Sequence, residues 1–161
     1  MKKHLIQSTL IFSGIIWACS CHKNSAPTSS SITPIYTMTA VVTKAGTATF
    51  FSTIGSQYIF ATKNNNECLI SANDTMNNSI VSNFTFKIGN FYDGGEFYID
   101  SASSVTAYYE TTGGSVIQTA FSIGTINVLV SGEDVSGTFN GTLTDGSVVT
   151  NGKFTSSGQG F

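Results

Sequence analysis

The sequence contains no arginine, and histidine is confined to its first 22 residues. The basic residues are all lysines, and the only histidines are His4 and His22. Nucleic-acid binding needs clustered Lys and Arg to displace counterions from phosphates, so the composition argues against it. A domain beyond residue 22 also lacks the base of a Ser-His-Asp or Cys-His site and the ligands of a histidine zinc site. The composition therefore excludes the commonest nucleophilic and zinc chemistries.

Cysteine is scarce as well, with three residues in the chain: Cys19, Cys21 and Cys68. One thiol beyond the N-terminal region cannot form an intradomain disulfide or a thiolate metal site. Cys68 lies in the strand-like run 67–70, where a free cysteine behaves as a small hydrophobic residue. We therefore expect a buried thiol and a fold that depends on its hydrophobic core.

The N-terminal residues have the pattern of an export signal. Lys2 and Lys3 precede an apolar run, 5–18, which is followed by Cys19 and Cys21. A basic start, a short apolar centre and small residues before a cysteine are typical of a bacterial lipoprotein signal. A helix that spans a bilayer needs about 20 mostly apolar residues, and this run is shorter and more polar. The pattern favours a cleaved lipoprotein signal over a transmembrane helix.

Two cysteines compete for the lipid. Cys21 follows the small residue Ser20 and is our preferred lipidation site, whereas Cys19 follows Ala18 and is the alternative. An ordinary secretory signal cut near Ala18 is a further alternative. Two or more acyl chains give stable membrane anchoring. We therefore expect a palmitate-type lipid anchor at the bacterial cell envelope, with the outer membrane as the expected location.

These features divide the chain into three parts. Residues 1–20 are the predicted signal peptide. Residues 21–34 are rich in Ser, Thr and Pro and cannot bury enough apolar surface to fold, so they are interpreted as a flexible tether. Residues 35–161 have the usual size of one domain.

The domain is predicted to be all-β. It lacks helical periodicity and consists of short runs rich in Val, Ile, Thr, Phe and Tyr, separated by Gly, Asn, Asp and Ser. About ten strands must hide their edges by stacking or by closure, so we favour an antiparallel β-sandwich, with a closed or partly open β-barrel as the alternative. The expected strands are 36–42, 47–53, 57–62, 67–72, 81–88, 96–100, 104–111, 115–122, 125–130, 135–143 and 147–156.

Two glycine-containing turns give sharper predictions. Gly113-Gly114 predicts a hairpin. Asp145-Gly146 predicts a type I′ hairpin with a two-residue loop, because both central residues of that turn need a positive φ. In this register Leu143 lies opposite Val148. Phe139 then lies opposite Gly152, where its ring can cover a strand glycine that has no side chain.

Three acidic residues around Gly94-Gly95 are the candidate chemical site: Asp93, Glu96 and Asp100. Two carboxylates at a suitable separation can hydrolyse a glycosidic bond. Carboxylates can also bind Ca²⁺, the one cofactor that the sequence suggests. The alternative is that these are solvated acids flanking a turn, and no catalytic residue is assigned.

Aromatic residues are densest in the same region. Tyr92, Tyr98, Tyr108 and Tyr109 could stack on sugars or seat a peptide if they are exposed, although most strand aromatics fill cores. Neighbours in a strand point to opposite faces, so one of Tyr108 and Tyr109 should face outward.

Two tripeptides, Asp74-Thr75-Met76 and Asp100-Ser101-Ala102, resemble the sequence that some Bacteroidota O-glycosylate on exported proteins. The resemblance implies Thr75 and Ser101 as modification sites. The second tripeptide has the alternative role of ending a strand.

A broader resemblance lies in the C-terminal part. Residues 124–128, 135–143 and 149–154 read GTINV, VSGTFNGTL and VTNGKF. This series is similar to the closing GTF-x-GTL and G-x-F strands of a group of uncharacterised Bacteroidota lipoproteins with a small β domain behind a lipid anchor. The resemblance implies a location and a fold but no catalytic residues, and it does not cover residues 156–161.

The leading functional hypothesis is a lipid-anchored, non-catalytic envelope module. Its expected partners are the membrane, reached through the lipid, and a glycan or an envelope protein. A small carboxylate-dependent glycoside hydrolase is the alternative. A purely structural surface protein is a third possibility.

Overall fold

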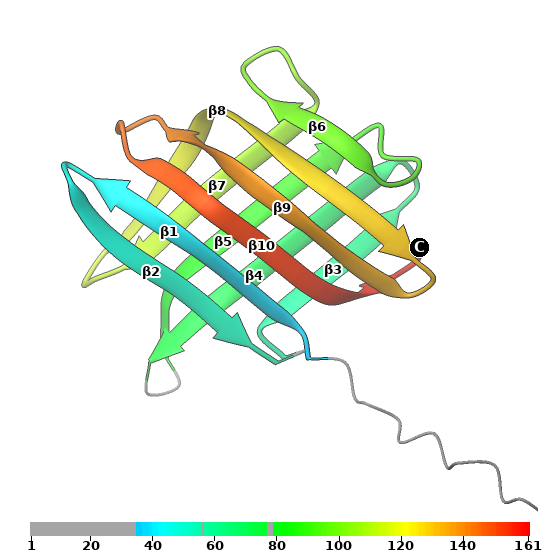
Figure 1. Cartoon of the computed structure of the whole chain (residues 1–161), viewed down its shortest axis with the longest axis horizontal. Coiled ribbons are helices and arrows are strands. Elements are labelled where there is room, and N and C mark those ends of the chain that lie inside the picture. Colours follow the sequence, from blue (N-terminus) through cyan, green and yellow to red (C-terminus); the bar gives the residue numbers. More distant parts are fainter. Residues whose placement is uncertain (1–34, 56, 77–78) are drawn as a thin grey trace, which may run out of the picture. The chain divides into compact units, whose positions relative to one another are not determined.

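The computed structural model describes residues 35–55, 57–76 and 79–161. The predicted signal peptide, the tether and the lipidation candidates Cys19 and Cys21 lie outside these residues. The described residues form ten strands and no helix (Figure 1). The strands are β1 Thr37–Lys44, β2 Thr47–Ile54, β3 Ile59–Asn64, β4 Glu67–Met76, β5 Ser79–Gly89, β6 Gly95–Ile99, β7 Val105–Thr112, β8 Val116–Ser131, β9 Asp134–Leu143 and β10 Val148–Gln159.

The strands form one sheet that closes on itself. A continuous ring of pairs runs β10-β3-β4-β5-β7-β8-β9 and returns to β10. Strands β1 and β2 extend the sheet from β10, and β6 pairs with β8 outside the ring. The all-β prediction is confirmed, and the architecture is the barrel alternative rather than the preferred sandwich, because the two layers are joined by strand pairing at both sides.

Strand β8 makes one of these joins. Its first residues pair with β7, and its later residues pair with β9 and β6 (Figure 1). The sequence pattern predicts two strands here, 115–122 and 125–130, and this division is wrong. A register shift between Phe121 and Ile123 absorbs the irregularity that suggested a break, so the 16-residue strand continues from one layer into the other.

A short parallel contact makes the other join. Gly158 pairs with Ala61, and Gln159 pairs with Thr62, which links β10 to β3. The Phe161 ring then lies edge-on against Phe91, with 6.0 Å between the ring centroids. These contacts give a structural role to residues 156–161, for which the sequence had offered none.

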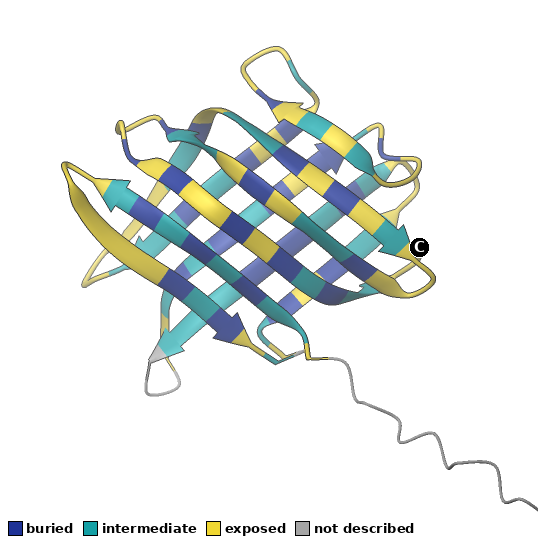
Figure 2. Cartoon of the chain, in the orientation of Figure 1, coloured by how far each residue is buried: buried dark blue, intermediate teal, exposed yellow. Residues whose placement is uncertain are grey.

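The space between the layers is filled by aromatic side chains. Phe84 lies at the centre, with its ring centroid 4.8 Å from Phe51, 4.7 Å from Tyr109 and 5.2 Å from Phe139. Buried positions alternate with exposed ones along most strands of both layers (Figure 2). The interior is therefore a packed core, as expected for a barrel of this strand number.

Glycines make room for these rings. Phe139 lies opposite Gly152 as predicted, and Phe154 lies opposite Gly137 in the same strand pair. A Cβ on Gly152 would come within 2.5 Å of the Phe139 ring, and one on Gly137 within 2.6 Å of the Phe154 ring. The large and small residues alternate so that bulky rings fit the narrow interior.

The turn between β9 and β10 differs from the prediction. Gly146 has a φ of 82°, but Asp145 has no positive φ, so the turn is not type I′. The loop has three residues, because the Leu143 N–H donates to the Ser147 carbonyl. Val148 consequently lies opposite Thr142 rather than Leu143, and a bulge before Gly152 restores the predicted register further along. The Gly113-Gly114 hairpin is confirmed, since β7 and β8 pair directly across it.

Candidate functional site

The candidate site is a surface cleft of about 410 Å³ where β7 and β8 separate. The two strands pair from Thr112 opposite Val116 as far as Tyr108 opposite Ala120. Beyond that point β8 turns into the other layer, where its partners are β9 and β6. Residues of the β6–β7 connection line the end of the cleft where β7 and β8 have separated. The cleft therefore follows from the same bend in β8 that joins the two layers.

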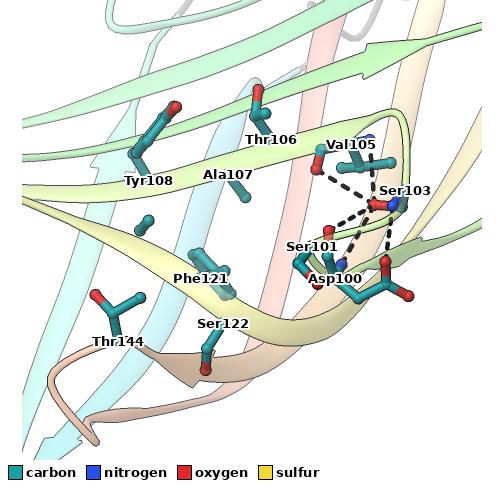
Figure 3. A pocket seen from close by; sticks show the side chains of 11 residues that line it. Asp100, Ser101, Ser103, Val105, Thr106, Ala107, Tyr108, Phe121, Ser122 and Thr144 are labelled. Carbon is teal, nitrogen blue, oxygen red and sulfur yellow. Dashed lines mark hydrogen bonds between the residues drawn. The ribbon is translucent and has the colours of Figure 1, made fainter.

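The cleft combines hydroxyl groups with the ring of Tyr108 and an apolar base that includes the ring of Phe121 (Figure 3). Its five hydroxyl side chains from Ser and Thr come from the β6–β7 loop, β7, β8 and the β9–β10 turn. Tyr108 is half-buried, whereas Phe121 is only 7% exposed and belongs to the core. The lining residues are Asp100, Ser101, Ser103, Val105, Thr106, Ala107, Tyr108, Ala120, Phe121, Ser122 and Thr144.

The wide end of the cleft is held by a hydrogen-bonded turn. One carboxylate oxygen of Asp100, Oδ1, accepts the backbone N–H groups of Ala102 at 2.8 Å and Ser103 at 2.7 Å. The Ser103 hydroxyl lies 3.3 Å from the backbone nitrogen of Val105 and accepts its N–H. Asp100 therefore fixes the loop that ends β6, and Ser101 stays exposed at the rim of the cleft.

A second polar group lies on the outer face beside Tyr108. Tyr108 pairs with Thr85 on β5, which in turn pairs with Ser71 on β4. The Asn83 side-chain amide donates to Ser71 Oγ at 3.1 Å and to Asn73 Oδ1 at 2.7 Å, while Thr85 donates to Asn83 Oδ1 at 2.7 Å. This network holds the outer surface next to Tyr108 in one arrangement.

The structure does not bring the three predicted acids together. Asp93 precedes the five-residue strand β6 and Asp100 follows it, which places their backbones roughly 20 Å apart at the usual rise per residue. Glu96 lies on the outer face of β6, roughly 13 Å along the strand from Asp100. Within the described residues, no three His, Cys, Asp or Glu side chains gather in a way that could hold a metal ion. Of the three, only Asp100 lines the cleft.

Of the four tyrosines predicted as candidate contacts, Tyr108 alone lines the cleft. Tyr109 is 9% exposed and packs in the core, so Tyr108 is the outward member of the pair, as expected. Tyr92 and Tyr98 are 70% and 63% exposed, but they lie in the loop before β6 and on its outer face, away from the cleft lining.

Two other residues singled out in the sequence, Cys68 and Thr75, do not line the cleft. Cys68 is fully buried, and burial raises the pKa of its thiol to about 12, as expected for a core cysteine. Thr75 is half-buried near the end of β4 and does not line the cleft. Ser101 is thus the one candidate modification site that lies at the cleft.

Sequence reasoning missed Thr106, Ser122 and Thr144. Each is an ordinary polar residue in a Thr- and Ser-rich chain, and the three come from segments that no local pattern connects. Only the divergence of β7 from β8 brings them together.

Along the described part of the chain, no helix is long and apolar enough to cross a membrane. Comparisons of the chain with protein-family models, with curated proteins and with solved structures each found no match.

Proposed function

We propose that this chain is a lipid-anchored cell-envelope protein whose barrel is a non-catalytic binding module for a neutral glycan. The observation that carries the proposal is the cleft beside Tyr108. It presents hydroxyl groups around an aromatic ring and an apolar base, in a volume of about 410 Å³. Ligand sites commonly have such a volume and combine an apolar lining with a few placed polar groups.

The chemistry of the cleft favours a sugar over a charged ligand. Its only ionisable acid is Asp100, which already accepts two backbone hydrogen bonds in its own turn. Hydroxyl groups can donate to and accept from the hydroxyls of a sugar, and an aromatic ring can pack against its apolar face. No lysine lines the cleft, so an anionic ligand would find no counter-charge there.

The anchor rests on the N-terminal pattern. Lys2 and Lys3, the apolar run 5–18 and the small residues before Cys19 or Cys21 support lipid attachment. The resemblance to uncharacterised Bacteroidota lipoproteins points the same way and stays a prediction. The hydrolase alternative gains no support, because a glycosidase needs two carboxyl groups facing one site, and Asp100 is the only carboxylate that lines the cleft.

Binding to a panel of neutral oligosaccharides tests the module. Titration calorimetry of any sugar that binds should show about tenfold weaker binding for Tyr108→Ala, a loss of about 1.4 kcal/mol. Tyr98→Ala is the matched control, since Tyr98 is an exposed strand tyrosine outside the cleft. Equal losses in both variants, or binding only of charged glycans, would contradict the proposed site.

Mass spectrometry of the mature protein tests the anchor independently. We expect an N-terminal acylated cysteine at residue 21, and Cys21→Ala should abolish the acyl mass and release the protein from membranes. Loss of the acyl mass only in Cys19→Ala would move the anchor to Cys19. An unacylated protein in the cytosol would refute the anchor and leave the binding test unaffected.

A further inference from the structure

The sheet has two free edges, β2 and β6, which differ in length and in charge. Strand β2 pairs with β1 alone, and β6 pairs with β8 alone among the described strands. A free edge exposes unpaired backbone N–H and C=O groups, which can pair with another strand. The two edges lie at opposite sides of the same layer (Figure 1).

The β6 edge has two features that discourage pairing with another strand, short length and charge. It is only five residues long, and it includes the charged residue Glu96. Asp93 and Asp100 flank it on either side. Short length and charge are the usual protection of an exposed edge.

The β2 edge has neither of these features. Its eight residues, Thr-Ala-Thr-Phe-Phe-Ser-Thr-Ile, include no charge and no proline. It pairs with β1 from Thr47 to Ile54 without a bulge. Its composition of Thr, Phe and Ile favours the extended conformation. The strand is therefore free of bulges, uncharged and paired on one side only.

The faces of β2 are assigned by burial. Phe51 and Thr53 are buried toward the core, at 1% and 5% exposure. Phe50 and Ile54 point outward and are 65% and 66% exposed. A partner strand that continued the sheet would have to keep this alternation, because a one-residue slip would exchange the two faces.

We propose that β2 pairs antiparallel with β2 of a second copy of this chain, about a two-fold axis through Phe50. In this register each Phe50 lies opposite Phe50 of the other copy, and Ala48 lies opposite Ser52. The inner residues Thr49 and Phe51 also lie opposite each other, so both cores stay on one side of a continuous sheet. The alternative axis through Phe51 preserves the faces but pairs rings that are already buried, so it leaves both Phe50 rings exposed.

The second copy is favoured over a foreign strand by the composition of the edge. A foreign partner is commonly selected by complementary charge, and β2 has no charge to offer. A two-fold pairing requires only that a strand match itself, and such isologous pairing is the commonest form of oligomer. Strand β2 can match itself in this way because Phe50, whose ring points outward, lies near the midpoint of the strand.

Disulfide trapping in the full-length chain tests the contact. Opposite residues in an antiparallel pair have Cα atoms about 4.5–5.5 Å apart, which lies within the range of a disulfide. Phe50→Cys should therefore form a covalent dimer under mild oxidation by diamide. Leu129→Cys is the control, because Leu129 is an equally exposed outward residue on the paired strand β8. Cys68 is buried and should not contribute. The chain without the Phe50→Cys change, oxidised in the same way, controls for cross-links through Cys19 or Cys21.

Charge exchange tests the same register without a covalent bond. Phe50→Lys and Phe50→Glu place like charges opposite each other, so each variant alone should sediment as a monomer. An equimolar mixture should recover the dimer. Leu129→Lys should sediment like the unmodified chain, which reports that a surface lysine does not by itself dissociate the dimer.

Three outcomes would overturn the proposal. The unmodified chain could be monomeric at tens of micromolar. Cysteines at residues 50 and 129 could cross-link equally, which would indicate random collision. Phe50→Cys could cross-link only to a different protein, which would assign the edge to a foreign strand.

Discussion

Gly152→Ala should destabilise the barrel, although alanine normally suits a strand better than glycine. Replacing a strand glycine by alanine gains about 0.5–1 kcal/mol from the lower entropy of the unfolded chain. At Gly152, however, the new Cβ would lie 2.5 Å from Cδ2 and 2.6 Å from Cγ of Phe139, and against the Phe139 backbone oxygen. The ring cannot move away freely, because its centroid is 4.7 Å from Phe86 and 5.2 Å from Phe84.

The expected magnitude follows from these opposing terms. Overpacking a core costs about 1–3 kcal/mol, and the backbone contact places this site at the upper end. After the entropic gain, a net loss of about 2 kcal/mol remains, which corresponds to a fall in Tm of roughly 8 °C for a domain of this size.

Thermal and urea unfolding followed by circular dichroism would measure the loss. Gly113→Ala is the matched control, because a Cβ there meets no atom within 4 Å. A Gly152→Ala protein as stable as the Gly113→Ala protein would refute the close contact between Phe139 and residue 152. The double variant Phe139→Leu/Gly152→Ala should lose less than the sum of the two single losses if the ring is the main obstacle.

Three further perturbations probe other parts of the fold. The Cys68 thiol, whose pKa burial raises to about 12, should resist iodoacetamide at pH 8 until urea unfolds the protein, and labelling of the folded protein would contradict its burial. Hydrogen bonds from Lys44 and Ser147 lower the pKa of Asp145 to about 2, so its stabilising effect is present above pH 4 and fades as pH falls toward 2. NMR titration should show this pKa rising in Lys44→Ala, with a stability loss below about 1 kcal/mol because the pair is partly exposed. Asn83→Ala removes the amide that joins β4 to β5 and should lower the free energy of unfolding by about 1–3 kcal/mol, whereas an unchanged urea midpoint would show that the network adds nothing.

Local patterns predicted most strands because their signals are local. Alternating apolar residues and glycine-rich boundaries placed every strand except β8 to within a few residues. The position of the Phe139 ring over Gly152 followed from simple counting along a hairpin. The turn register was wrong near Asp145 because a three-residue loop and a later bulge offset each other. No single-residue signal distinguishes that combination from a plain two-residue turn.

The architecture and the site depended on information that is not local. Closure of the barrel requires two pairs between residues almost a hundred positions apart, at Gly158 with Ala61 and Gln159 with Thr62. Strand β8 appeared as two strands because a glycine lies near its bend, yet the bend is what opens the cleft. Among the predicted site residues, Asp100, Ser101 and Tyr108 reached the cleft, while Asp93 and Glu96 lie outside it, since nearness in sequence does not bring side chains together along an extended strand.

The parallel contact between β10 and β3 also orders the events of folding. Hairpins such as β4–β5 and β9–β10 join neighbours in sequence and can form as soon as their residues are available. The seam at residues 158 and 159 joins the last strand to one that was synthesised long before it. The chain can therefore assemble its hairpins early but cannot become a closed barrel until β10 is in place, and until then the edges of β3 and β10 that meet in the barrel remain open to other strands.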